Sequence, residues 1–215
     1  MLQLLKIIFV IYVMDDFIKI VYDSIPSDLC RDIIEKFNTD PELHQGKLGP
    51  GLLNTNMKDS TDLHIMHRDD WKDITNLLVK HLADSLQEYF KYIEKNVFGD
   101  KNLKILSKIF GDNISHTGFQ VQRYKSGGAF NWHTDDAYNS KRLLAFIWYL
   151  NTVDVESGGS TDFLNGKSVQ PKEGSILFFP ATWSYIHRGN VVTKGEKYII
   201  TGFITQSNLK ICDEQ

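Results

Sequence analysis

The distribution of glycine places the turns of this chain mainly in its second half. Of the 15 glycines, four lie before residue 111 and 11 lie from that residue onward. Short apolar or alternating segments follow one another between these glycines, which is typical of strands joined by tight turns. The segments span residues 117–124, 142–150, 168–170, 175–179, 184–188 and 197–205. Strands of this number and spacing predict a β-sandwich or barrel.

The first half has the pattern of helices. Residues 17–22 alternate as one strand, and Ile25-Pro26-Ser27 then predicts the cap of a helix. The apolar residues of this helix share one face: Leu29, Cys30, Ile33, Ile34 and Phe37. A second helix is predicted over residues 70–97, with a buried stripe of Trp71, Ile74, Leu77, Leu78, Leu82, Leu86, Tyr89, Phe90, Ile93 and Val97. Residues 38–67 between them show little periodicity, and we expect either a lid or binding segment or a mobile surface loop.

Charge and cysteine content argue against two classes of protein. Lys and Arg number 24 and Asp and Glu number 27, so the formal net charge is −3, and no basic stripe is present that could follow a phosphate backbone. We therefore expect no nucleic-acid partner. Cys30 and Cys212 are too few for a disulfide scaffold and form no C-x-x-C pair for zinc, which favours a reducing compartment such as the cytoplasm.

Residues 1–14 form an apolar N-terminal extension. The run meets Asp15 and Asp16 well short of the ~20 apolar residues that a spanning helix needs, so we expect no stable membrane span. Its bulky, acidic end is unlike a signal-cleavage site, and export is the alternative to a cytoplasmic location. The run is otherwise interpreted as an extra edge strand, or as residues upstream of a true start at Met14. Residues 15–110 are then a helical support region, in the same domain as residues 111–208.

One group of side chains has the spacing of a metal site. In an extended segment His133 and Asp135 project on the same face, so that both can reach one ion, and His187 is the only histidine downstream. Two histidines and one carboxylate form the facial triad associated with non-haem Fe(II), while zinc hydrolases use the same types of ligand. The other histidines are interpreted as surface or structural residues, with one weak pair at His64 and His67: His44, His64, His67, His81 and His116.

Further motifs surround this group. After His187, the residues Val192, Gly195 and Lys197 place a lysine at the start of an apolar strand. Upstream lie Arg123-Tyr124, Gly127-Gly128 and Phe130 before His133, then Gly158-Gly159-Ser160-Thr161-Asp162-Phe163, and then Pro171, Gly174 and Leu177-Phe178-Phe179-Pro180. Over residues 115–205 these motifs together resemble the catalytic domain of the prolyl 4-hydroxylases, within the Fe(II)/2-oxoglutarate-dependent dioxygenases.

The resemblance implies a mainly β fold with supporting helices, built on a double-stranded β-helix (jelly roll) core. Residues 111–208 would be the dioxygenase core. His133, Asp135 and His187 would hold Fe(II).

The resemblance also implies residues for the co-substrate. Lys197 would bind the distal carboxylate of 2-oxoglutarate, Tyr124 would donate its hydroxyl to the same carboxylate, and Thr161 would line the pocket. The competing interpretation of Lys197 is an exposed strand lysine, with Lys194 as the residue that binds the carboxylate. The competing interpretation of Tyr124 is a core tyrosine, and that of Thr161 is a strand residue with a structural hydroxyl.

The implied activity is hydroxylation of a C–H bond, with O2 as co-substrate, ascorbate as reductant and release of succinate and CO2. The expected substrate is a prolyl or other peptidyl residue of a peptide or protein. A hydroxylase of a free amino acid or other small molecule, and a non-catalytic metal-binding jelly-roll protein, are the alternatives. Residues 136–142 and 38–67 are candidates for substrate contact. No oligomeric state is predicted.

Overall fold

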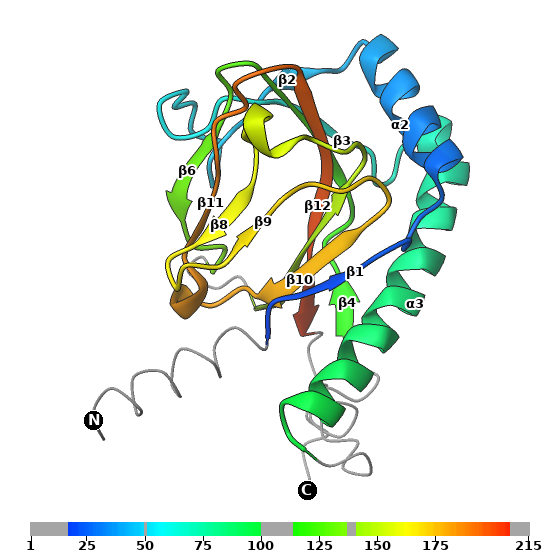
Figure 1. Cartoon of the computed structure of the whole chain (residues 1–215). Coiled ribbons are helices and arrows are strands. Elements are labelled where there is room, and N and C mark those ends of the chain that lie inside the picture. Colours follow the sequence, from blue (N-terminus) through cyan, green and yellow to red (C-terminus); the bar gives the residue numbers. More distant parts are fainter. Residues whose placement is uncertain (1–16, 50, 100–113, 137–140, 207–215) are drawn as a thin grey trace, which may run out of the picture.

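The core of the fold is a sandwich of two antiparallel β-sheets (Figure 1). A computed structural model describes residues 17–49, 51–99, 114–136 and 141–206 of the chain. Among these residues, eight strands form the larger sheet in the order β1-β10-β7-β12-β5-β3-β2, with β4 paired to β12. Its strands are β1 (Lys19–Val21), β2 (His44–Gln45), β3 (Thr61–His64), β4 (Ile114–His116), β5 (Gln120–Lys125), β7 (Arg142–Tyr149), β10 (Ile176–Pro180) and β12 (Glu196–Gln206).

The smaller sheet faces the larger one. In the part of the chain that the structure describes, it has four strands in the order β6-β11-β8-β9. These are β6 (Phe130–His133), β8 (Thr161–Phe163), β9 (Ser168–Val169) and β11 (His187–Gly189), with the 3-10 turn η2 (Val155–Ser157) before β8. The predicted mainly β, jelly-roll architecture is therefore confirmed.

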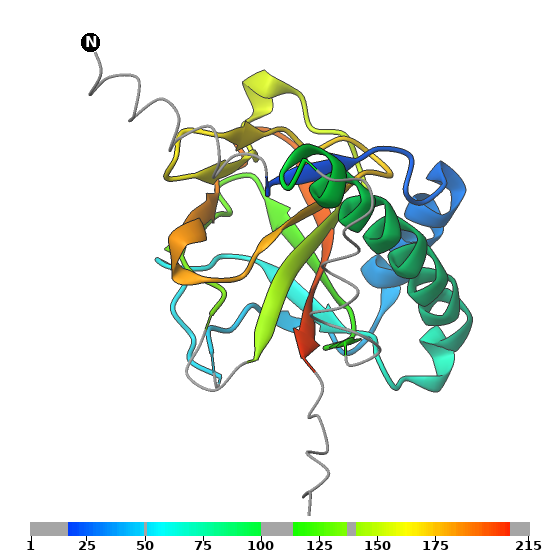
Figure 2. The same ribbon diagram turned by 90° about the horizontal axis from the view of Figure 1, so that it is seen from below.

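Two helices cover the outer face of the larger sheet (Figures 1 and 2). They are α2 (Ser27–Thr39) and α3 (Lys72–Asn96), the second preceded by the 3-10 turn η1 (Asp69–Trp71), and both helices were predicted. Apolar residues recur every three or four positions, so each helix buries one stripe. The predicted stripe of α3 is wrong at Leu77, which is 48% exposed. Leu77 lies about 100° around the helix from the buried Leu78, outside the face that meets the sheet.

Central strands of the larger sheet are buried on both faces. Along β7, Leu144, Phe146 and Trp148 pack in the cluster that includes the helices, while Ala145, Ile147 and Tyr149 pack in the cluster between the two sheets. Successive side chains of a strand point to opposite faces, which explains why β7 is apolar from residue 143 to its end. On the neighbouring β12, Ile200 packs with the helices, so Lys197 and Ile199 face the interior of the sandwich.

Residues 38–67 differ from the expected loop because they add two strands to the larger sheet. β3 pairs with β5, and β2 pairs with β3 at the edge. The strand pattern was hidden because this segment buries charge: Lys58 and Asp62 are both under 5% exposed, and their side chains pair at 2.6 Å. Residues 184–188, expected as one strand, are instead divided between the 3-10 turn η3 (Trp183–Tyr185) and β11.

The apolar run of residues 1–14 lies outside the described residues. Within the described ranges, no helix combines the length and the hydropathy that crossing a membrane requires.

Candidate metal centre and co-substrate pocket

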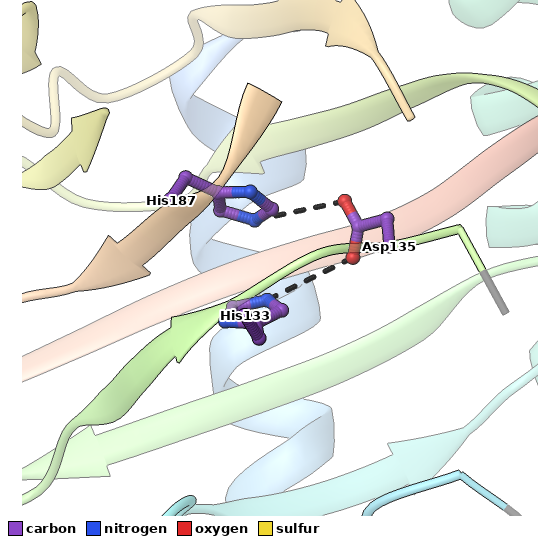
Figure 3. A group of neighbouring side chains, drawn as sticks. All are labelled: His133, Asp135 and His187. Carbon is purple, nitrogen blue, oxygen red and sulfur yellow. Dashed lines mark ion pairs between the residues drawn. The ribbon is translucent and has the colours of Figure 1, made fainter. Parts of the chain in front are cut away.

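The two histidines of the predicted metal site are direct partners across the smaller sheet. His133 ends β6, His187 begins β11, and their ring centroids lie 4.2 Å apart. Asp135 follows β6 and turns its carboxylate toward both rings (Figure 3). Its Oδ1 lies 3.7 Å from Nε2 of His133, and its Oδ2 lies 3.6 Å from Nε2 of His187. One ligand atom from each residue lies within 4.8 Å of the others, so the three predicted residues are together.

Backbone carbonyls orient both imidazoles. Nδ1 of His133 lies 2.7 Å from the carbonyl of Asn131, and Nδ1 of His187 lies 3.0 Å from the carbonyl of Tyr185. These contacts favour hydrogen on Nδ1, which leaves the lone pair of each Nε2 directed at the centre of the group. Burial lowers the pKa of each histidine to about 4. Both rings are therefore neutral at pH 7, the form that binds a metal ion.

Arg142 holds the backbone of Asp135. Its Nη1 donates to the Asp135 carbonyl at 2.7 Å, and its guanidinium stacks on Phe203 at 3.8 Å from the ring centroid. Burial raises the pKa of the Asp135 carboxyl, and a bound cation would favour the ionised form again. Two neutral imidazoles and one carboxylate on one side of a point are a donor set that fits Fe(II) with coordination positions left open.

Lys197 is buried beside this group. Its side chain lies on the inner face of β12, the residue is 2% exposed, and Nζ donates to the carbonyl of Gly159 at 2.9 Å. Among the described residues, none offers Lys197 a carboxylate within ion-pair distance. Burial lowers the pKa of Lys197 to about 8, and Asp162 opposes this shift. A buried ammonium without a carboxylate is unfavourable, so this position suits an anionic ligand. The competing residue, Lys194, is exposed.

Tyr124 and Thr161 lie near Lys197 but already have partners. Tyr124 is the register partner of Lys197, whose Nζ lies 4.9 Å from the tyrosine ring centroid, and the Tyr124 hydroxyl donates to Oε1 of Gln122 at 2.7 Å. The hydroxyl of Thr161 lies 2.8 Å from that of Tyr149 on β7. Gln122 and Tyr149, which were not predicted from the sequence, thus hold the two predicted hydroxyls.

The Gly-Gly motif shapes the backbone beside Lys197. Gly158 has φ +71° and Gly159 has φ +70°, a region that residues with a side chain rarely adopt. A Cβ at Gly158 would overlap with the carbonyl oxygen of Val191. Glycine here therefore allows the chain to pass close to Val191 while the carbonyl of Gly159 meets the lysine.

One cavity of about 810 Å³ contains all six of the residues predicted from the sequence. It extends toward the surface along a part that we call the outer cavity, which is lined by His44, Lys47, His64, Met66 and Gln120. The segment 38–67 thus forms one wall, and Arg142 lines the cavity near the metal group. Its volume lies within the range of sites that bind small molecules.

Several polar residues of the cavity and its surroundings were missed from the sequence, namely Gln120, Gln122, Lys58 and Asp62. Gln120, Gln122 and Tyr124 alternate along β5, and this period of two was a usable signal. Lys58 and Asp62 gave no such signal because their pairing depends on how residues 44–62 fold. The two predicted as a weak metal pair, His64 and His67, belong to no group of three or more metal-ligand side chains among the described residues.

Part of the chain matches a known family. Residues 119–205 match the family model of the 2OG-Fe(II) oxygenase superfamily. No curated protein matches the sequence.

The fold is similar to that of solved prolyl hydroxylases. A prolyl hydroxylase from Trichoplax adhaerens, in complex with a hypoxia inducible factor peptide fragment, has a TM-score of 0.68 at 14% identity, covering 95% of this chain and 92% of that one. A viral collagen prolyl hydroxylase from Paramecium Bursaria Chlorella virus-1, solved with 2-oxoglutarate, has a TM-score of 0.61 at 19% identity, covering 89% and 97%. A prolyl-4-hydroxylase from Pseudomonas putida has a TM-score of 0.60 at 17% identity, covering 92% and 99%.

The matched segment contains the His-Asp-His group and Lys197, and the wider fold has the same architecture over most of each chain. The family implies Fe(II), 2-oxoglutarate and O2 as the reacting partners. The chain thus matches the 2OG-Fe(II) oxygenase superfamily over residues 119–205, and its fold is similar to that of solved prolyl hydroxylases.

Proposed function

We propose that this protein is an Fe(II)- and 2-oxoglutarate-dependent dioxygenase that hydroxylates a C–H bond of a prolyl or other peptidyl residue. In this reaction 2-oxoglutarate is oxidised to succinate and CO2. One oxygen atom of O2 enters succinate and the other enters the substrate as the new hydroxyl, with ascorbate as the reductant that maintains Fe(II).

One juxtaposition carries the proposal. A three-residue group with neutral imidazoles shares a cavity with a buried lysine that has no carboxylate partner among the described residues. A metal site alone would fit a binding protein. A second, cationic site in the same cavity is suited to a dicarboxylate that reaches from the metal to Lys197.

The chain's own residues then have separate roles. His133, Asp135 and His187 hold Fe(II), which when bound supplies the activation of O2. The ammonium of Lys197 pairs with the distal carboxylate of 2-oxoglutarate, and the Tyr124 hydroxyl donates to that carboxylate.

Pocket walls complete the co-substrate site. The contact between Thr161 and Tyr149 fixes the wall beside Lys197. Apolar residues such as Ile147 and Ile199 limit the access of water to this end of the cavity.

A peptide substrate is favoured over a free amino acid by two observations. The similar Trichoplax adhaerens enzyme was solved with a peptide fragment. The cavity of about 810 Å³ also includes the outer cavity in addition to the metal group and Lys197, which offers further surface for the residues of a peptide that flank the reacting one.

The experiment is an anaerobic titration of the Fe(II) protein with 2-oxoglutarate, followed by addition of O2. We expect a visible absorption band when 2-oxoglutarate chelates the metal, slow succinate formation on adding O2, and faster formation with proline-containing peptides. Lys197→Met should abolish saturable binding while Fe(II) binding persists. A wild-type protein that binds Fe(II) but gives neither the band nor succinate would overturn the proposal, and a tightly retained Zn²⁺ would favour a hydrolase instead.

A further inference from the structure

A row of hydrogen-bonded side chains leads from Tyr124 to the outer cavity. Three of them occupy alternate positions of β5, and the fourth, His64, is the register partner of Gln120 on β3. The Tyr124 hydroxyl donates to Oε1 of Gln122 at 2.7 Å, and Nε2 of Gln122 donates to Oε1 of Gln120 at 2.6 Å. Nε2 of Gln120 lies 2.9 Å from Nε2 of His64. We call these four residues the β5 chain.

The inner half of the β5 chain is deeply buried. Tyr124 is 2% exposed and Gln122 is 4% exposed, and all four residues line the cavity. A buried amide is unfavourable unless its hydrogen bonds are made. The buried position of Gln122 is therefore stabilised by its hydrogen bonds to Tyr124 and Gln120. The outer end is His64, whose ring stacks on His44 with centroids 6.0 Å apart.

The direction of the β5 chain conflicts with co-substrate binding. A carboxylate can only accept hydrogen bonds, and the single hydroxyl hydrogen of Tyr124 is already donated to Gln122. Burial, and to a smaller extent the charge of Asp62, hold the pKa of Tyr124 well above its usual value, so the hydroxyl keeps that hydrogen.

Reversal of the β5 chain removes the conflict. When both amide groups turn over and His64 carries its hydrogen on Nε2, every donor and acceptor exchanges roles. Gln122 then donates to the oxygen of Tyr124, and the tyrosine hydrogen is free for another acceptor, such as a carboxylate bound beside Lys197. Hydrogen bonds that point the same way along a chain strengthen one another, so this donation from Gln122 makes Tyr124 a better donor.

We infer that Gln122 is a positioning residue which, with Gln120 and His64, orients the Tyr124 hydroxyl toward the distal carboxylate of 2-oxoglutarate. The inference rests on the proposed function, since it assumes that this carboxylate lies between Lys197 and Tyr124. It extends that proposal by linking the affinity for 2-oxoglutarate to an amide row that ends in the outer cavity.

Neighbouring charges are consistent with this role. The nearest carboxylate on β3, Asp62, is paired with Lys58 at 2.6 Å and accepts from Ser60 at 2.7 Å. Its charge is thus balanced and does not exclude a second carboxylate beside Tyr124. On the other side, Nζ of Lys197 lies 4.9 Å from the centroid of the Tyr124 ring.

A double-mutant cycle tests the inference. The dissociation constant for 2-oxoglutarate is measured on anaerobic Fe(II) protein, from the absorption band, for the wild type, Gln122→Leu, Tyr124→Phe and the double variant. We expect each single change to weaken 2-oxoglutarate binding about tenfold, which is the effect of one hydrogen bond. The double variant should bind 2-oxoglutarate no more weakly than the single variant with the lower affinity, because Gln122 acts only through the Tyr124 hydroxyl.

Controls separate positioning from a general structural effect. Fe(II) affinity should stay within about twofold in every variant, and Gln122→Met should reproduce Gln122→Leu with the same result in the cycle. Gln45→Leu removes a glutamine on the same sheet that bonds Asp59 outside the β5 chain, and it should leave the 2-oxoglutarate affinity unchanged. Wild-type affinity in Gln122→Leu, or effects of the two substitutions that multiply, would overturn the inference while leaving the proposed function intact. Failure of the wild type itself to bind 2-oxoglutarate would remove both.

Discussion

His133 and His187 are direct register partners on adjacent antiparallel strands, with ring centroids 4.2 Å apart. A single pairing of β6 with β11 therefore brings two metal-ligand candidates from distant parts of the sequence to one point. Asp135 lies just after the end of β6. It is positioned by its spacing of two residues from His133 and by the hydrogen bond from Arg142 to its backbone carbonyl. The site is thus assembled by sheet pairing, and the geometry of its ligands depends on the register of the smaller sheet.

Removal of either histidine should abolish tight Fe(II) binding. His187→Ala leaves one imidazole and one carboxylate, and we expect the Fe(II) dissociation constant to rise by more than about a hundredfold. Loss of a residue that only hydrogen-bonds to a metal ligand already lowers metal affinity by about ten- to a hundredfold. Anaerobic calorimetric titration measures this. His81→Ala, on α3 and outside the metal group, is the matched control and should bind Fe(II) like the wild type. Equal Fe(II) affinity in the two variants would place the metal elsewhere.

Binding of 2-oxoglutarate should weaken above about pH 8. The pKa of Lys197 is lowered to about 8 by burial in the free protein, and a bound carboxylate would raise it. Below pH 8 the lysine is already charged and the affinity should be constant. Above pH 8 each binding event must take up a proton, so the dissociation constant should rise by up to about tenfold per pH unit.

The matched variant for this pH dependence is Lys197→Arg. A guanidinium stays charged throughout the range, so any 2-oxoglutarate binding that this variant retains should be independent of pH from 7 to 9.5. The measurement is the anaerobic absorption titration repeated at each pH. A wild-type dissociation constant that is flat over the same range would contradict a lysine–carboxylate contact.

Much of the β-rich half could be predicted because its signals are local. Turn glycines, alternating burial and the short spacing of His133 and Asp135 are properties of neighbouring residues. His187 and Lys197 were linked to them through motifs, and the structure places all four in one cavity.

The segment 38–67 could not be predicted in the same way. Its strands add to the edge of a sheet whose centre comes from distant residues, and its buried polar groups resemble surface residues in the sequence. Asp62 is fully buried because Lys58 and Ser60 satisfy its carboxylate. Gln122 is also a buried polar residue that resembles a surface residue in the sequence, and its amide bonds Tyr124 and Gln120 on the same strand.

Lys58→Met should strongly destabilise the protein. The substitution leaves Asp62 as an unpaired buried charge, which we expect to lower the free energy of unfolding by about 3–5 kcal/mol in urea denaturation. Adding Asp62→Leu should restore most of this loss because no buried charge then remains. Lys36→Met is the control, since Lys36 pairs with Asp70 at 3.7 Å on the surface and should change the stability by less than about 1 kcal/mol. Similar losses of unfolding free energy in Lys58→Met and Lys36→Met would show that water reaches the Lys58–Asp62 pair.

Gly46→Ala should destabilise the same wall by overpacking. Gly46 donates its backbone N–H to the carbonyl of Ser60, and a Cβ there would overlap with the Ser60 hydroxyl oxygen and lie 3.1 Å from Cε of Lys58. The Ser60 hydroxyl cannot move away without losing its bond to Asp62. We expect a loss of about 1–3 kcal/mol in the free energy of unfolding. In Gly46→Ala/Ser60→Ala the overlap is absent, so the combined loss should be smaller than the sum of the two single losses. Strictly additive losses would mean that β2 moves away from the buried pair instead of packing on it.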